Sequence, residues 1–169
     1  MDIWASREER SDADGRKQML AEAITAKTSI DLLSRLVLGR HWRSLNIADH
    51  DEYKSLFSRV IIGGLAGRLD NLLGEFGGPL EEHFAIVNSK AVGKRDVLVH
   101  SKVIAADGQT LSVDWRLRQL KNGPAIIDLV VEGISLLVSQ RAEFAAVIER
   151  GRVDGLIEAL RDRARTGGF

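Results

Sequence analysis

The sequence predicts an α+β protein in which a small antiparallel four-stranded meander is covered by several helices. Two observations lead to this prediction. Apolar residues recur at helical spacing through the first half of the chain, up to a break at Gly77, Gly78 and Pro79. In the second half, apolar and polar residues alternate in short runs separated by turn residues, which is typical of antiparallel strands with one solvent-facing side.

The helical half begins with two short helices. Apolar residues lie three and four positions apart over residues 16–25 and again over residues 29–38. Gly39 follows directly, and we expect it to end the second helix as a left-handed cap.

A longer helix is predicted to begin directly after Asn46, its N-cap, with Asp49 at the acidic third position and apolar residues recurring from Tyr53 to Phe76. Its apolar face is wider than one neighbouring helix would need, so we expect it to cover a large apolar surface. Gly63, Gly64 and Gly67 lie inside it, and each is about 1 kcal/mol less favourable than Ala in a helix interior. We interpret these glycines as a bend or a close approach of the backbone.

Four strands are predicted in the second half, over residues 83–91, 97–105, 111–120 and 126–132. Asp107-Gly108 and Asn122-Gly123 supply tight hairpin turns. The third strand alternates cleanly, and its apolar face carries Leu111, Val113, Trp115 and Leu117. A last helix over residues 153–165 completes the predicted fold.

The chain turns directly from strand to helix within residues 126–148, where the spacing of apolar residues changes after Gly133. On the strand, alternation places Asp128 and Glu132 on the face opposite to the apolar residues. We therefore interpret Asp128 as a solvated or ion-paired carboxylate rather than a general base. Ser135 lacks the glycine two residues later that a nucleophile elbow requires, and helix capping is the better interpretation.

Composition limits the class of protein. A chain of 169 residues suits one domain, and we expect a loose segment over residues 1–15, anchored by Trp4, before a single domain over residues 16–169. Basic and acidic residues number 24 each, which gives no bulk electrostatic case for binding nucleic acid or an anionic membrane. No apolar run reaches the length of a membrane span, and the first residues lack the apolar core of a signal peptide. We expect either a cytoplasmic protein or a mature chain whose signal has been removed.

No residue pattern predicts catalysis or metal binding. The four histidines show no spacing typical of metal ligands, and no cysteine is present. We therefore expect no enzyme activity, no metal and no cofactor. The surplus of apolar side chains leaves two interpretations open from the residues alone: a well-packed core, or a deep apolar cavity between the sheet and the helices.

Four short motifs occur in an order and at spacings that resemble one protein family. They are residues 36–43 (LVLGRHWR), residues 113–117 (VDWRL), residues 128–136 (DLVVEGISL), and Phe144 followed by Asp154, Gly155, Leu156, Ile157 and Leu160. Together they resemble the MlaC family, also called the toluene-tolerance auxiliary component, which includes a hopanoid-associated branch named HpnM. The similarity runs from about residue 21 to residue 160. Many relatives have Tyr in place of His41 and Trp in place of Pro124, and these departures suggest a branch with altered ligand preference.

The resemblance implies a function. Members of the family are soluble periplasmic carriers of phospholipid that shuttle lipid between an outer-membrane lipoprotein complex and an inner-membrane ABC transporter with an MCE-domain protein. It implies that the acyl chains lie in an apolar cavity between helices and sheet, with the head group largely outside. It thus implies a periplasmic, monomeric carrier without a cofactor, whose cargo is a phospholipid or a hopanoid-type lipid. An enzyme with a cone-like α+β pocket and an adaptor without ligand are the competing interpretations.

The apolar residues expected to bind the lipid are Leu36, Val37, Trp42, Phe57, Val60, Ile61, Leu65, Val113, Trp115, Leu129, Val131, Ile134, Phe144 and Ile148. For the two tryptophans, lining the pocket and anchoring a helix or strand remain equal alternatives. The arginines that could contact a head group or a partner protein are Arg40, Arg43, Arg141, Arg150 and Arg152.

Overall fold

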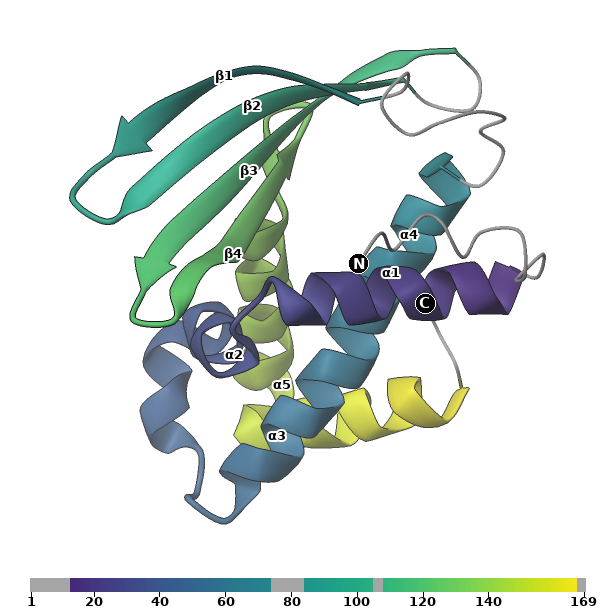
Figure 1. Cartoon of the computed structure of the whole chain (residues 1–169). Helices are drawn as coiled ribbons and strands as arrows, with labels where there is room; N and C mark the ends of the chain where they lie inside the picture. Colours follow the sequence, from purple (N-terminus) through teal and green to yellow (C-terminus); the bar gives the residue numbers. More distant parts are fainter. Residues whose placement is uncertain (1–12, 74–83, 105–107, 167–169) are drawn as a thin grey trace.

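The computed structural model describes residues 13–73, 84–104 and 108–166. A curved antiparallel sheet forms one layer, and the helices lie together on one side of it (Figure 1). The predicted α+β class is therefore confirmed. The predicted anchor Trp4, the helix end at Gly77, Gly78 and Pro79, and Asp107 of the first predicted turn lie outside the described residues.

The first two helices form close to the predicted positions. α1 spans Ala13–Ala26 and α2 spans Ile30–Leu38. Ser29 is the N-cap of α2, where its hydroxyl accepts a hydrogen bond from the backbone N–H of Leu32 at 3.3 Å. Gly39 ends α2 with a φ of 58°, a conformation that favours glycine, and the chain continues as a 3₁₀ helix, η2 (Gly39–Ser44).

The predicted long helix is interrupted rather than continuous. α3 (Asp49–Phe57) passes into a π-helical turn, η3 (Ser58–Ile62), and then into α4 (Gly63–Leu73). A change of helical geometry therefore lies directly before Gly63, while the bend or close backbone approach expected from the glycines stays a prediction. The predicted N-cap is wrong: Ala48 occupies that position, because residues 46–49 already form a turn and Asn46 donates through its side chain to the Asp49 carboxylate at 3.2 Å.

The sheet has five strands in the order β1-β2-β3-β4-β5, one more than predicted. They are β1 (Phe84–Val92), β2 (Asp96–Ile104), β3 (Thr110–Leu120), β4 (Gly123–Val131) and β5 (Ile134–Ser135). The additional strand arises because Glu132 and Gly133 adopt positive φ values of 49° and 79°, which fold the next two residues back onto β4. This short hairpin positions the start of the last helix.

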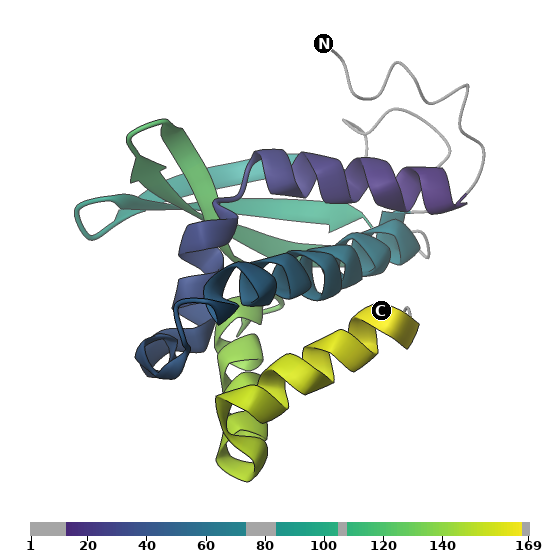
Figure 2. The same cartoon turned by 90° about the horizontal axis from the view of Figure 1, so that it is seen from below.

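The last helix, α5 (Leu136–Thr166), bends sharply at Arg152, whose φ is 59° (Figure 2). The predicted helix over residues 153–165 is its second half. Both halves contribute to one buried cluster with α2 and α3, and Tyr53 and Phe57 are fully buried within it. The Tyr53 hydroxyl donates to the carbonyl oxygen of Ser34 at 3.0 Å, and burial raises the pKa of Tyr53.

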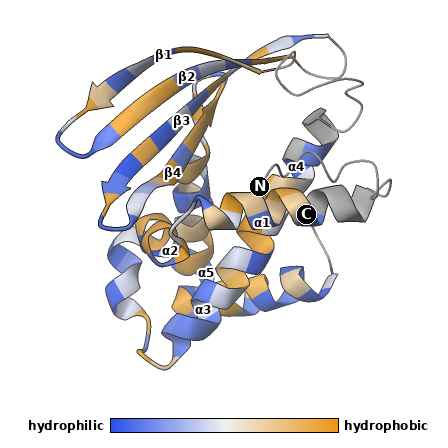
Figure 3. Cartoon of the chain, viewed as in Figure 1, coloured by the Kyte–Doolittle hydropathy of each residue, from blue (hydrophilic) through white to orange (hydrophobic). Residues whose placement is uncertain are grey.

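The two faces of the sheet differ in polarity along the strands, as the alternating colours of Figure 3 show. On the face turned away from the helices, Asp96 accepts hydrogen bonds from the guanidinium groups of Arg116 and Arg118 at 2.7 to 2.9 Å. His100 and Asp114 are joined at 2.8 Å on the same face. The predicted alternation of β3 is thus confirmed, and its apolar side faces the helical layer.

Candidate functional site: an apolar cavity between sheet and helices

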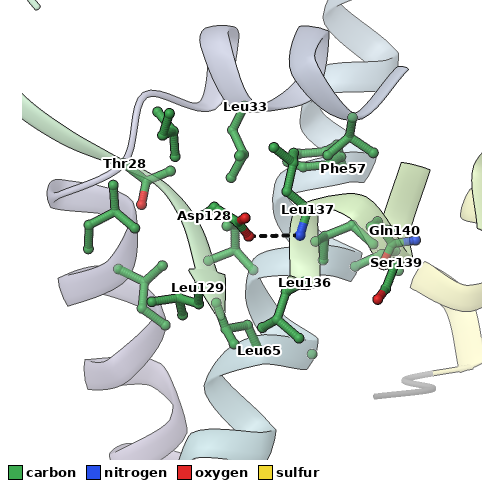
Figure 4. A pocket seen from close by; sticks show the side chains of 18 of the residues that line it. Thr28, Leu33, Phe57, Leu65, Asp128, Leu129, Leu136, Leu137, Ser139 and Gln140 are labelled. Carbon is green, nitrogen blue, oxygen red and sulfur yellow. Dashed lines mark hydrogen bonds between the residues drawn. The ribbon is translucent and has the colours of Figure 1, made fainter. Parts of the chain in front are cut away.

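A cavity of about 460 Å³ lies between the sheet and the helical layer. Its walls come from α1, α2, α3, η3, α4, β3, β4 and both halves of α5, and Figure 4 shows how many of the side chains converge. The volume falls within the range of roughly 300–1,000 Å³ that is usual for pockets holding small organic ligands. Its apolar lining residues are Ile24, Leu33, Val37, Phe57, Val60, Ile61, Ile62, Gly64, Leu65, Trp115, Ile126, Ile127, Leu129, Leu136 and Leu137.

Asp128 lies in the wall of this apolar cavity and is only 8% exposed. One carboxylate oxygen accepts from the backbone N–H of Leu137 at 2.9 Å, and the other accepts from the Ser135 hydroxyl at 2.6 Å. Figure 4 draws the first of these bonds. The expectation of a solvated or ion-paired carboxylate is therefore wrong, because the hairpin after β4 brings the first turn of α5 over this side chain.

The capping role predicted for Ser135 is confirmed. Its hydroxyl oxygen accepts from the backbone N–H of Val138 at 3.0 Å while its proton is donated to Asp128. A β-bulge helps to place this group: Arg116 pairs with Asp128 and Leu117 pairs with Ile126, which leaves Ile127 as the extra residue. The junction of β4 and α5 is thus held by side-chain hydrogen bonds at the cavity wall.

Thr28 contributes another polar group to the cavity lining. Its hydroxyl oxygen is buried and has no hydrogen-bond partner within the part of the chain that the structure describes. The backbone at this point is held by β4, since the N–H of Ile126 donates to the carbonyl oxygen of Lys27 at 2.8 Å. In Figure 4 the Thr28 side chain is directed toward the other lining residues.

The fourteen residues expected to bind lipid divide into two groups. Those that line the cavity are Val37, Phe57, Val60, Ile61, Leu65, Trp115 and Leu129. Trp115 both lines the cavity and is anchored, because its indole N–H donates to the Ser101 hydroxyl at 2.9 Å. The structure therefore brings seven of the predicted side chains together, while their binding of lipid stays a prediction.

The other seven predicted residues lie elsewhere. Phe144 and Ile148 are buried in the helical core, and Trp42 stacks on His50 with ring centroids 4.3 Å apart. Ile134 is 62% exposed on β5. Val113 is buried and Leu36 and Val131 are half-buried, and these three are likewise not lining residues of this cavity.

Four lining residues are exposed to solvent, and all four are polar: Arg68, Ser139, Glu143 and Arg163. We call these four residues the rim, because exposed lining residues mark where a cavity meets solvent. Glu143 and Arg163 form an ion pair at 3.0 Å. Sequence reasoning missed all four, and none of the five arginines singled out from the sequence lines the cavity.

Comparison with known proteins decides the family. A model of the MlaC protein family matches residues 1–162. The chain belongs to the MlaC family. Among curated proteins, none shows a significant match to this MlaC-family chain.

A solved structure shares the fold of this MlaC-family chain. It is a phospholipid-binding protein from Ralstonia solanacearum, determined in complex with a phospholipid, and it is 23% identical in sequence. The match covers 98% of this chain and 92% of that chain, with a TM-score of 0.77. At this identity the likeness establishes the shared fold. Within the described residues, no helix has both the length and the apolar character needed to cross a membrane.

Proposed function

We propose that this MlaC-family chain is a periplasmic lipid carrier that holds acyl chains in the cavity between the sheet and the helices. The observation that carries the proposal is the cavity itself, which lies inside a fold of this family and has apolar walls. The Ralstonia solanacearum protein of the same fold is a phospholipid-binding protein solved with its phospholipid, which supports the same class of ligand here.

The physical need for such a cavity follows from the ligand. An acyl chain of about 15 methylene groups exposed to water costs roughly 12 kcal/mol, at about 0.8 kcal/mol for each methylene. A protein that moves a membrane lipid through water must replace that contact with its own apolar surface. Aliphatic side chains such as Ile61, Leu65 and Leu129 provide this surface without fixing the ligand through polar contacts.

The same geometry favours a binding role over catalysis. Asp128 is the buried carboxylate in the cavity lining, and both of its oxygens accept hydrogen bonds that hold the start of α5. A carboxylate used in this way supports the scaffold rather than accepting a proton from a substrate. We propose that the protein is a carrier without enzymatic activity.

A direct test is to purify the protein, extract it with organic solvent and analyse the extract by mass spectrometry. We expect about one lipid per protein, and uptake of lipid when the protein is incubated with vesicles. A protein that carries no lipid after purification and takes none from vesicles would contradict the proposal. The chemical identity of the extracted lipid distinguishes a phospholipid from a hopanoid-type cargo.

We further propose that the protein acts as a monomer that exchanges lipid with an outer-membrane lipoprotein complex and an inner-membrane ABC transporter carrying an MCE-domain protein. The support is family membership. The test is transfer of a labelled lipid from the loaded protein to proteoliposomes that contain the transporter complex. Transfer no faster to these proteoliposomes than to protein-free vesicles would contradict this step.

A further inference from the structure

The two hairpin turns at one end of the sheet carry a local excess of positive charge. Residues 90–98 and 116–124 hold six basic residues and one acidic residue, although basic and acidic residues number 24 each in the whole chain. The pairing of β2 with β3 brings these two segments together, since Asp96 lies opposite Arg118. The backbone N–H of Gln119 also donates to the carbonyl oxygen of Arg95 at 2.8 Å. We call residues 90–98 and 116–124 the basic tip.

The one acidic residue of the basic tip does not offset its exposed cations. Asp96 is only 6% exposed, and its carboxylate already accepts hydrogen bonds from Arg116 and Arg118. The other four cations are exposed, and none is paired with another residue in the ranges that the structure describes. They are Lys90, Lys94, Arg95 and Lys121. Unpaired charges of one sign, gathered at one place, create a potential that attracts a polyanion.

The basic tip projects from the molecule. In Figure 1 and Figure 2 the turn between β1 and β2 extends out past the helical layer, and the turn between β3 and β4 lies at the same end of the sheet. Apolar side chains accompany the cations there, because Val97 is 39% exposed and Pro124 is exposed beside the second turn. A flat surface can therefore meet this end of the sheet without touching the helices.

We propose that the basic tip docks the protein on a negatively charged membrane surface. Cations next to exposed apolar side chains suit the boundary between lipid head groups and acyl chains. Three of the four unpaired cations are lysines, whose flexible point charges suit the mobile head groups of a fluid bilayer better than one rigid anion. The docking surface lies outside the cavity, so this proposal goes beyond the proposed function and does not depend on the cargo.

Two other polyanions fit the basic tip less well. Single-stranded nucleic acids bind through aromatic side chains that stack on the bases, and residues 90–98 and 116–124 contain no aromatic residue. An acidic protein would have to immobilise the lysine side chains, which costs conformational entropy that a fluid bilayer does not demand. Binding to an acidic polypeptide is therefore made an outcome of the test.

The test is flotation of the protein with vesicles in a density gradient at low salt. One set of vesicles contains phosphatidylcholine alone, and the other contains phosphatidylcholine with phosphatidylglycerol as a minor component. We expect wild type to bind the vesicles with phosphatidylglycerol about tenfold more strongly or better. This binding should fall in high salt, because the cations are exposed and their charges are screened.

Three variants assign the binding to the basic tip. Each cation near an anionic surface contributes about fivefold to binding, which corresponds to roughly 1 kcal/mol. Lys121→Gln should therefore weaken binding about fivefold, and the double variant Lys94→Gln with Arg95→Gln about 25-fold. The double variant Arg59→Gln with Arg165→Gln removes the same charge from exposed positions on the helices, and it should float as wild type does. A thermal melt of each variant checks that the fold is intact.

The outcomes decide between a membrane and an acidic protein. Equal flotation of wild type with both kinds of vesicle overturns the proposal, and so does equal binding by the two double variants. If wild type binds soluble polyglutamate through the basic tip but does not float with phosphatidylglycerol vesicles, the tip fits an acidic protein and membrane docking is overturned. None of these results touches the carrier function, because that function is measured by lipid extraction and uptake.

Discussion

The Asp128 carboxylate on β4 accepts a hydrogen bond from the backbone N–H of Leu137, at 2.9 Å, and so fixes the start of α5 against the sheet. The first N–H groups of a helix have no partner within the helix, and a buried one must be satisfied from outside. Asp128 and Ser135 together supply these acceptors where α5 begins at the cavity wall.

Replacing Asp128 should therefore destabilise the protein. We expect Asp128→Ala to lower the free energy of unfolding by about 2 kcal/mol, because it leaves the Leu137 N–H and the Ser135 hydroxyl without their acceptor. Urea denaturation followed by circular dichroism measures the change. Glu149→Ala, at an exposed position on the same helix, is the matched control and should stay within about 0.5 kcal/mol of wild type. Equal stability of the two variants would contradict the role assigned to Asp128.

Replacing Thr28 should stabilise the protein, in contrast to replacing Asp128. Its buried hydroxyl has no partner among the described residues, and an unsatisfied buried polar group costs roughly 1–3 kcal/mol. Thr28→Val keeps the shape and removes the hydroxyl, so it should raise the free energy of unfolding of the lipid-free protein by about 1 kcal/mol. Thr25→Val, at an exposed position in α1, should produce no comparable gain. A loss of stability in Thr28→Val would show that the hydroxyl is satisfied in solution.

The ion pairs of Asp96 should make the free energy of unfolding depend on pH. The guanidinium groups of Arg118 and Arg116 lower the pKa of this carboxyl from 3.8 to about 2. Because the pKa in the folded protein lies below the unfolded value, the stabilisation is fully present above about pH 4 and is lost as the pH falls toward 2. Asp96→Asn should cost about 1 to 2 kcal/mol at pH 7, since Arg116 remains partly exposed and is screened by solvent. The difference from wild type should shrink steeply between pH 4 and pH 2, where the carboxyl is about half protonated, and should vanish only below pH 2. A constant difference between pH 7 and pH 2 would contradict this account.

Parts of the fold and of the cavity follow directly from the spacing of apolar residues. Spacings of two and of three or four predicted the strands and helices, and for β3 they identified which side faces inward. For β4 they did not: alternation placed Asp128 opposite Ile127 and Leu129, whereas all three residues are buried and line the cavity. Spacing does not tell whether the space opposite an inward side chain is filled. Phe144 therefore gave the same signal as Leu129, although Phe144 packs in the core and Leu129 lines the cavity.

Other features depend on contacts that a local pattern does not contain. The bulge at Ile127 arises from the pairing of β3 with β4, and the two-residue strand β5 is too short to show an alternation. Arg68 was missed because an arginine on the polar side of a helix is ordinarily solvated. Its significance appears only when α4 and α5 are placed on the same cavity. The positive φ of the Glu132-Gly133 turn was partly foreseeable, since glycine is the residue most tolerant of it.

Filling the cavity should abolish lipid uptake without unfolding the protein. Leu65→Trp places a large side chain in the cavity lining. In a filled core such a substitution would cost about 1–3 kcal/mol of stability through overpacking. The cost should be smaller here because the indole can enter the empty cavity. We expect uptake from vesicles to fall at least tenfold while the thermal midpoint changes little. Ile47→Trp adds the same side chain at a position that is 88% exposed, and it should load lipid as wild type does. A folded Leu65→Trp protein that still loads lipid normally would contradict this prediction. The added indole reduces the volume of the cavity, so normal loading would mean that the acyl chains bind elsewhere.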